Sequence, residues 1–204
     1  MEKIGFLTET QVREIQEAYG TPVFVYDQET LEDQARQALD FPSPFGLTAR
    51  YAMKALPTGA ILRVLNRAGM HIDASSGFEA HRALRAGVPP SHILLTAQQQ
   101  PEDLSALLAQ GVGFNAGSLR QLDLFGERYP GREVTIRINP GLGSGHNNRT
   151  NVGGPASSFG IWHSDLDRVA EIQTKHDLKI TRLHTHIGSG ADPQIWERCA
   201  QLSL

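Results

Sequence analysis

The feature that most constrains the fold is a repeat of about 21 residues. Short apolar segments with strand character begin near residues 48, 70, 92, 112 and 133. Each is followed by a segment in which apolar residues recur at helical spacing, as at Ile61, Leu62, Leu65 and Ala68. A regular alternation of this length is typical of β/α units, whose parallel strands form one sheet.

The full set of predicted elements extends this rhythm along the chain. We expect strands at 22–26, 48–52, 70–74, 92–96, 112–115, 133–139 and 181–186. We expect helices at 30–39, 59–68, 77–86, 102–110, 118–128 and 165–175, and a further helical stretch that buries Cys199. Gly69, Gly87 and Gly111 follow the last turns of three helices, where glycine adopts a left-handed conformation without strain.

Composition excludes several other classes of protein. The net charge of the 204 residues is −3, which gives no electrostatic reason to bind nucleic acid. No apolar run is long enough to span a membrane, and no secretory signal is visible, so we expect a cytoplasmic protein. The single cysteine, Cys199, excludes an internal disulfide and a cysteine-based zinc site.

Small polar residues follow several of the predicted strands. They include Ser75 and Ser76, Gly117 and Ser118, and Gly188 and Ser189. The carboxyl ends of parallel strands carry the chemistry in β/α folds, and small residues there leave room for a ligand. The alternative is that Ser76 and Ser118 only cap the helices that follow them.

The segment between Asn139 and His163 breaks the rhythm. It is rich in glycine and has almost no periodicity. Because long loops in compact domains are usually functional or disordered, we expect a lid or a ligand-facing loop. Its Gly-Leu-Gly-Ser-Gly run resembles a phosphate cradle, but no helical pattern follows directly, which argues against a dinucleotide site or a P-loop.

Lys54 ends the first strand of the repeat, in Tyr-Ala-Met-Lys-Ala. A lysine at this position points toward the mouth of the sheet. It could form a Schiff base, because partial desolvation frees the lone pair of an amine. It could also bind a phosphate as a point charge, or be an ordinary solvated strand end.

His184 and His186 lie on one face of the last strand, because side chains alternate along a strand. Such a pair can bind a metal in a β/α barrel, with Asp73 as the only well-placed carboxylate. Alternatively, one ring stacks on a flat cofactor while Gly188 and Ser189 approach a phosphate. The third possibility is that both histidines lie in the core or at the rim without a ligand.

Taken together, four motifs occur in a specific order. They are Tyr-Ala-Met-Lys at 51–54, Asp-Ala-Ser-Ser-Gly-Phe-Glu at 73–79, Arg-Ile-Asn-Pro-Gly at 137–141 and His-Thr-His-Ile-Gly-Ser-Gly at 184–190. This set resembles the fold-type III pyridoxal-phosphate decarboxylases. Residues 145–154 and 159–162 resemble the branch of that family that acts on diaminopimelate.

The resemblance implies an alanine-racemase-like (β/α)8 barrel over residues 29–204, with residues 1–28 contributing a strand to a second, β domain. It implies decarboxylation of meso-2,6-diaminopimelate to L-lysine, with pyridoxal 5′-phosphate as cofactor and no metal. It further implies a homodimer with a shared active site, acting on a small amino acid and binding neither nucleic acid nor membranes.

The resemblance also assigns residues. Lys54 matches the lysine that holds pyridoxal phosphate as a Schiff base, and His186 matches the histidine stacked on its ring. Gly188 and Ser189 match residues near the phosphate. The polar residues of the pocket are matched by Asp73, Glu79 and Arg137. The chain departs from the family at Leu56, where asparagine is common, and at Phe78, where glycine is common.

A closed barrel needs eight β/α units, whereas six barrel-type strands are predicted here. We therefore expect an incomplete barrel, and we expect the isolated 204-residue chain to be inactive as a decarboxylase and poorly soluble or partly unfolded. Three other functions stay open: an ornithine- or arginine-type decarboxylase of the same family, a metal-dependent barrel hydrolase that uses His184 and His186, and a non-catalytic relative that binds a partner protein.

Overall fold

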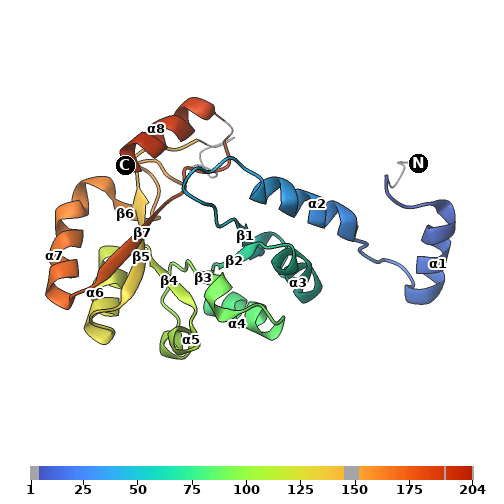
Figure 1. Ribbon diagram of the computed structural model, residues 1–204, viewed down its shortest axis with the longest axis horizontal. Coiled ribbons are helices and arrows are strands. Elements are labelled where there is room, and N and C mark those ends of the chain that lie inside the picture. Colours follow the sequence, from blue (N-terminus) through green and yellow to red (C-terminus); the bar gives the residue numbers. More distant parts are fainter. Residues whose placement is uncertain (1–4, 145–151, 191, 204) are drawn as a thin grey trace.

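The computed structural model describes residues 5–144, 152–190 and 192–203, which form one parallel sheet with helices around it and an N-terminal helix that lies apart from the sheet (Figure 1). The strands are β1 Arg50–Ala52, β2 His71–Ala74, β3 Ile93–Leu95, β4 Gly113–Ala116, β5 Glu133–Asn139, β6 Ile161–Trp162 and β7 Lys179–Thr185. The helices are α1 Glu9–Tyr19, α2 Gln28–Leu39, α3 Gly59–Arg67, α4 Gly77–Arg85, α5 Leu104–Gln110, α6 Leu119–Arg128, α7 Leu166–His176 and α8 Pro193–Ser203. Three short 3₁₀ turns are η1 Met53–Ala55, η2 Pro90–His92 and η3 His163–Asp165.

The strands pair in the order β1-β2-β3-β4-β5, and β5 also pairs with β6 and β7. Ile138 of β5 is opposite Thr185 of β7 and also opposite Ile161 of β6, so β6 and β7 lie on different edges of β5. Helices α3 to α7 form an outer arc around the strands (Figure 1). This is the predicted β/α architecture, and six of its seven predicted strands and all six predicted helices are confirmed within a few residues.

The predicted strand at 22–26 is wrong. These residues form no ladder in the described part of the chain, and the side chains of Val23, Phe24 and Tyr26 are exposed. Their β-branched and aromatic composition favours a strand, but that preference depends on packing against a neighbouring strand.

Helix α1 and strand β6 were not predicted. Val12, Ile15 and Tyr19 recur at helical spacing along α1, but this stripe was not used as a signal, and no residue of the helix is buried. Its start is nevertheless marked by a capping box, in which Thr8 and Gln11 bond each other's backbone N–H groups. Strand β6 has only two residues, too few for any alternation to be visible.

The two faces of the sheet differ in polarity. Ile72, Leu95, Phe114 and Ile136 are buried on the outer face, where the helices cover them. The alternate positions face inward, and register pairs them across strands, as in Ala52 with Asp73 and Arg137 with His184. Alternation and register together therefore gather the polar side chains on the inner face.

The glycines that follow the last turns of the helices adopt the predicted left-handed conformation. Gly87 and Gly111 have φ values of +86° and +103°, in the left-handed region that glycine occupies without strain. Each turns the chain from a helix toward the next strand. Among the described residues, no helix combines the length and the apolar character needed to cross a membrane.

Candidate active site

Lys54 lies in the η1 turn directly after β1, at the carboxyl end of the strand. Met53 beside it is fully buried and anchors the turn, whereas Lys54 is exposed. The positive charge of Lys54 is close enough to Asp73 and His186 to act on both. It opposes the rise in the pKa of Asp73 and adds to the fall in the pKa of His186. An exposed amine is thus held near two other predicted site residues.

Asp73 of β2 faces inward and is mostly buried. Its carboxylate Oδ1 accepts a hydrogen bond of 2.7 Å from the hydroxyl of Thr96. Burial raises the pKa of this carboxyl group, and the Thr96 hydrogen bond and nearby positive charges partly offset the rise. Those charges belong to Arg50, Lys54 and Arg137.

Arg137 of β5 extends from the inner face toward the glycine-rich loop. Its guanidinium carbon is 4.8 Å from the centroid of the Phe159 ring, within range of a cation–π contact. Burial lowers the pKa of Arg137, and the charge of Asp73 opposes this. A pocket opens beside Arg137 and Phe159, lined also by Thr96, Asn115 and Gln121.

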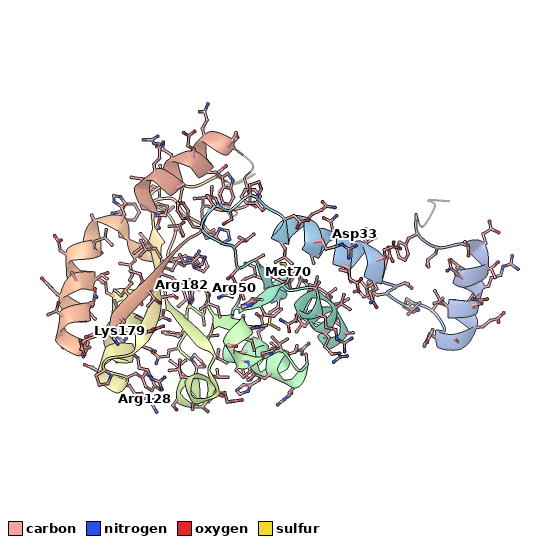
Figure 2. The ribbon with its side chains drawn as sticks, viewed as in Figure 1. Asp33, Arg50, Met70, Arg128, Lys179 and Arg182 are labelled. Carbon is pink, nitrogen blue, oxygen red and sulfur yellow. The ribbon has the colours of Figure 1, made fainter. Side chains whose placement is uncertain are left out.

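Two further cations, Arg50 and Arg182, lie within the arc of the strands. Arg50 on β1 and Arg182 on β7 are close to each other there (Figure 2), and the pKa of Arg50 is lowered by burial and then by the charge of Arg182. The inner face therefore carries more positive than negative charge around Asp73, which suits an anionic ligand.

His184 and His186 are both neutral at pH 7. Burial, together with the charges of Arg137 and of His186, lowers the pKa of His184 to about 4. Burial and the charges of Arg137 and Lys54 also lower the pKa of His186. The Nδ1 atom of His186 accepts a hydrogen bond of 3.0 Å from the backbone N–H of Gly188, which orients the ring.

The donors needed for a metal do not come together in the part of the chain that the structure describes. There, no group of three or more His, Cys, Asp or Glu side chains is arranged to hold an ion. His184 and His186 share a face as predicted, but Asp73 is engaged by Thr96. The geometry therefore offers no support for the hydrolase alternative.

The remaining predicted residues lie at the strand ends. Glu79 lies in the first turn of α4: its carboxylate accepts from the N–H of Ser75 at 2.7 Å, and its own N–H donates to Oγ of Ser76, the N-cap residue. Ser118 caps α6 in the same way, so both serines have the capping role that was the alternative. Gly188 is buried with a φ of +116°, and Ser189 is exposed.

The described ends of the glycine-rich loop pack against the segment that follows β7. The N–H of Ser144 donates to the carbonyl of Ile187 at 2.8 Å, and the N–H of Gly190 donates to the carbonyl of Ser144 at 2.9 Å. A Cβ on Gly153 would lie 2.8 Å from the His186 carbonyl oxygen, so only glycine fits there. Residues 145–151, which include most of the motif used to choose the diaminopimelate branch, lie outside the described residues.

Two inner-face residues, Thr96 and Asn115, were missed by sequence reasoning. Asn115 is fully buried, and its Nδ2 is 3.3 Å from Thr96 Oγ1 and 2.6 Å from His184 Nδ1. A polar residue inside the apolar segment Gly-Val-Gly-Phe-Asn-Ala was the available signal, because buried amides must be hydrogen-bonded.

Comparison with known proteins identifies the family of the chain. Residues 29–201 match the family model described as the pyridoxal-binding domain of pyridoxal-dependent decarboxylases. A diaminopimelate decarboxylase of Streptomyces coelicolor is 40% identical over 179 residues, covering 85% of this chain and 40% of the relative. The Escherichia coli K12 enzyme of the same name is 36% identical over 194 residues, covering 91% of this chain and 44% of the relative.

Solved structures show the same fold. A crystal structure of diaminopimelate decarboxylase matches with a TM-score of 0.84 and 34% identity, over 96% of this chain and 46% of that one. A lysine/ornithine decarboxylase of Vibrio vulnificus matches with a TM-score of 0.76 at 21% identity, over 95% of this chain and 50% of that one, and supports the fold alone. The chain spans less than half the length of the curated relatives it matches. The chain therefore belongs to the pyridoxal-dependent decarboxylase family and carries its pyridoxal-binding domain.

Proposed function

We propose that this chain is part of an enzyme that decarboxylates meso-2,6-diaminopimelate to L-lysine and carbon dioxide with pyridoxal 5′-phosphate. The observation that carries the proposal is the placement of Lys54 beside Asp73, Arg137 and His186 on one inner face, in a chain 36–40% identical to curated diaminopimelate decarboxylases. Lys54 is also the residue that a non-catalytic relative would have no reason to keep.

The residues around Lys54 fit the cofactor in charge and in shape. Positive charges of Arg50, Lys54 and Arg137 surround a single carboxylate, which suits a phosphorylated ligand. The neutral ring of His186, held by the Gly188 N–H, offers a flat surface to an aromatic ring.

We assign one role to each site residue on this basis. Lys54 attaches the cofactor, and His186 stacks on its ring. Gly188 and Ser189 lie near the phosphate. Asp73, Arg137 and Glu79 are assigned to the surroundings of the cofactor, Glu79 through its position at the capped start of α4; of the three, Arg137 also lines the pocket beside Phe159.

Pyridoxal phosphate, when bound, supplies an electron sink for the bond between Cα and the carboxylate. The chain's own residues bind and orient. The charge of Arg137 attracts carboxylates into the pocket beside Phe159. Asp73, held by Thr96, keeps a carboxylate within reach of the Lys54 charge.

The larger assembly follows from the same proposal. We propose a cytoplasmic homodimer whose active sites are shared between subunits. Residues 1–28 would belong to a second, β domain: the family match begins only at residue 29, and the exposed Val23, Phe24 and Tyr26 are available for its core.

The substrate is tested by measuring carbon dioxide release from labelled meso-diaminopimelate, L-ornithine and L-arginine with the full-length gene product. We expect release from diaminopimelate alone, because the curated relatives described above carry that name. Faster release from ornithine or arginine would assign the enzyme to the other branch of the family.

A second experiment tests the stacking role of His186. His186→Phe retains a flat aromatic face, so we expect cofactor binding to weaken by up to about tenfold without being lost. The measurement is a titration with pyridoxal phosphate followed by its absorption.

The matched control for that experiment is His81→Phe on α4, where the histidine pairs with Asp103. It should leave the titration unchanged. Stoichiometric metal in the purified protein that disappears in His186→Phe would contradict stacking and favour a metal-dependent hydrolase.

A further inference from the structure

Four inner-face side chains form a continuous hydrogen-bonded chain. Thr96 Oγ1 lies 2.7 Å from Asp73 Oδ1, Asn115 Nδ2 lies 3.3 Å from Thr96 Oγ1, and the same Nδ2 lies 2.6 Å from His184 Nδ1. This hydrogen-bonded series crosses the sheet from β2 to β7. Its two middle residues, Thr96 and Asn115, belong to none of the four family motifs.

The direction of this chain depends on the charge of Asp73. An ionised carboxylate only accepts hydrogen bonds, so Thr96 must donate its single hydroxyl hydrogen to Asp73. The oxygen of Thr96 then accepts from Asn115 Nδ2, and the second hydrogen of that amide goes to His184 Nδ1. Since Nδ1 is an acceptor, the hydrogen of the neutral imidazole is on Nε2.

A protonated Asp73 permits the reverse direction. The carboxyl group donates to Thr96, whose hydroxyl then donates to Asn115. The amide turns over so that its oxygen accepts from Thr96 and from His184, whose hydrogen is now on Nδ1. Asn115 Oδ1 is buried without a partner in the first arrangement, and Nδ2 would be so in the second, so the amide itself favours neither strongly.

We propose that Thr96 and Asn115 are positioning residues that couple the charge of Asp73 to the tautomer of His184, keeping hydrogen on Nε2 while Asp73 is ionised. The coupling deepens the proposed function, because Nε2–H becomes a hydrogen-bond donor on the inner face beside Arg137 and His186. His184 itself stays neutral near pH 7, so its tautomer and not its charge is what changes.

The surrounding charges set the range over which this coupling operates. Arg50, Lys54 and Arg137 face Asp73 and favour its ionised form, whereas burial opposes that form. Arg137 and His186 face His184, and both disfavour an imidazolium. Burial outweighs these charges at Asp73 and raises its pKa, while His184 remains uncharged near pH 7.

The test is the nitrogen chemical shifts of His184 in the cofactor-free full-length gene product labelled with ¹⁵N at histidine, with the signal assigned by its loss in His184→Gln. We expect the Nε2–H tautomer to predominate at pH 7. Asp73→Asn introduces an amide that can donate to Thr96 as well as accept from it, so the direction of the hydrogen bonds is no longer fixed and Nδ1–H should become a major form. Predominant Nδ1–H in the unmodified chain, or no response to Asp73→Asn, would overturn the proposal.

Variants at Thr96 test the connection itself. Thr96→Val removes the hydroxyl that links Asp73 to Asn115, so the tautomer of His184 should no longer respond to Asp73→Asn. Thr96→Ser keeps a hydroxyl and should restore the response. Thr135→Val is the matched control, because Thr135 pairs with Asn115 in register but is not a member of the hydrogen-bonded series. A response that survives Thr96→Val, or is abolished by Thr135→Val, would also overturn it.

Circular dichroism melts show whether each variant is folded. If Thr96→Val fails to fold, Asn115→Ser is used instead, because it removes the amide that links Thr96 to His184. The tautomer of His184 must then also stop responding to Asp73→Asn. No cofactor or substrate is used in these measurements, so failure of the coupling and failure of the proposed decarboxylase activity are separate results.

Discussion

Replacing Lys54 with arginine should reduce carbon dioxide release by about a thousandfold or more, because arginine keeps the positive charge but provides no amine that can form a Schiff base. The exposed position of Lys54 at the end of β1, beside Asp73 and His186, places the amine where the cofactor is proposed to bind. The measurement combines the release assay with the visible absorption of the protein-bound cofactor.

The attachment point can be checked directly. Borohydride reduction followed by peptide mapping should find the pyridoxyl group on Lys54. Lys179 at the opposite end of the sheet, where β7 begins, provides the control, and Lys179→Arg should leave both the label and the activity unchanged. A label on Lys175 or Lys179 would refute the assignment of Lys54.

Removing the Phe125 ring should give the largest loss of stability. Phe125 is fully buried on α6, and its ring stacks on Phe114 of β4 with centroids 5.3 Å apart. Phe125→Ala removes this contact and leaves a cavity between helix and sheet, which should lower the free energy of unfolding by about 3–5 kcal/mol. Urea unfolding followed by circular dichroism measures the change.

The neighbouring Leu124 is the matched control, because it is on the same helix but 42% exposed. Leu124→Ala should change the free energy of unfolding by no more than about 0.5 kcal/mol. Equal losses in the two variants would mean that α6 does not pack on the sheet through Phe125.

The strand–helix order could be predicted because it depends on short-range patterns. Apolar spacing in the helices and the glycines that end them are properties of neighbouring residues, and six strands and six helices followed from them. The predicted strand at 22–26 failed because a strand requires a pairing partner as well as β-forming residues. Helix α1 was missed although its cap and its apolar residues Val12, Ile15 and Tyr19 were both present in the sequence.

Some residues of the candidate site could likewise be predicted from local sequence, and others could not. Lys54 and His186 could be predicted because each lies in a motif whose residues are adjacent in the chain, and the resemblance of those motifs to a family gave them roles. Their proximity to Asp73 and Arg137 agrees with the parallel register, since the carboxyl ends of such strands meet at one edge of the sheet.

The sequence by itself therefore determined the β/α architecture, the family and the residues of its motifs. Only the tertiary structure brought Thr96 to Asp73, 23 residues away, and Asn115 to His184, 69 residues away. Which polar side chains meet on the inner face depends on the register between strands, and register is set by packing over the whole sheet. No local pattern contains that information, because the hydrogen-bonded partners lie on different strands.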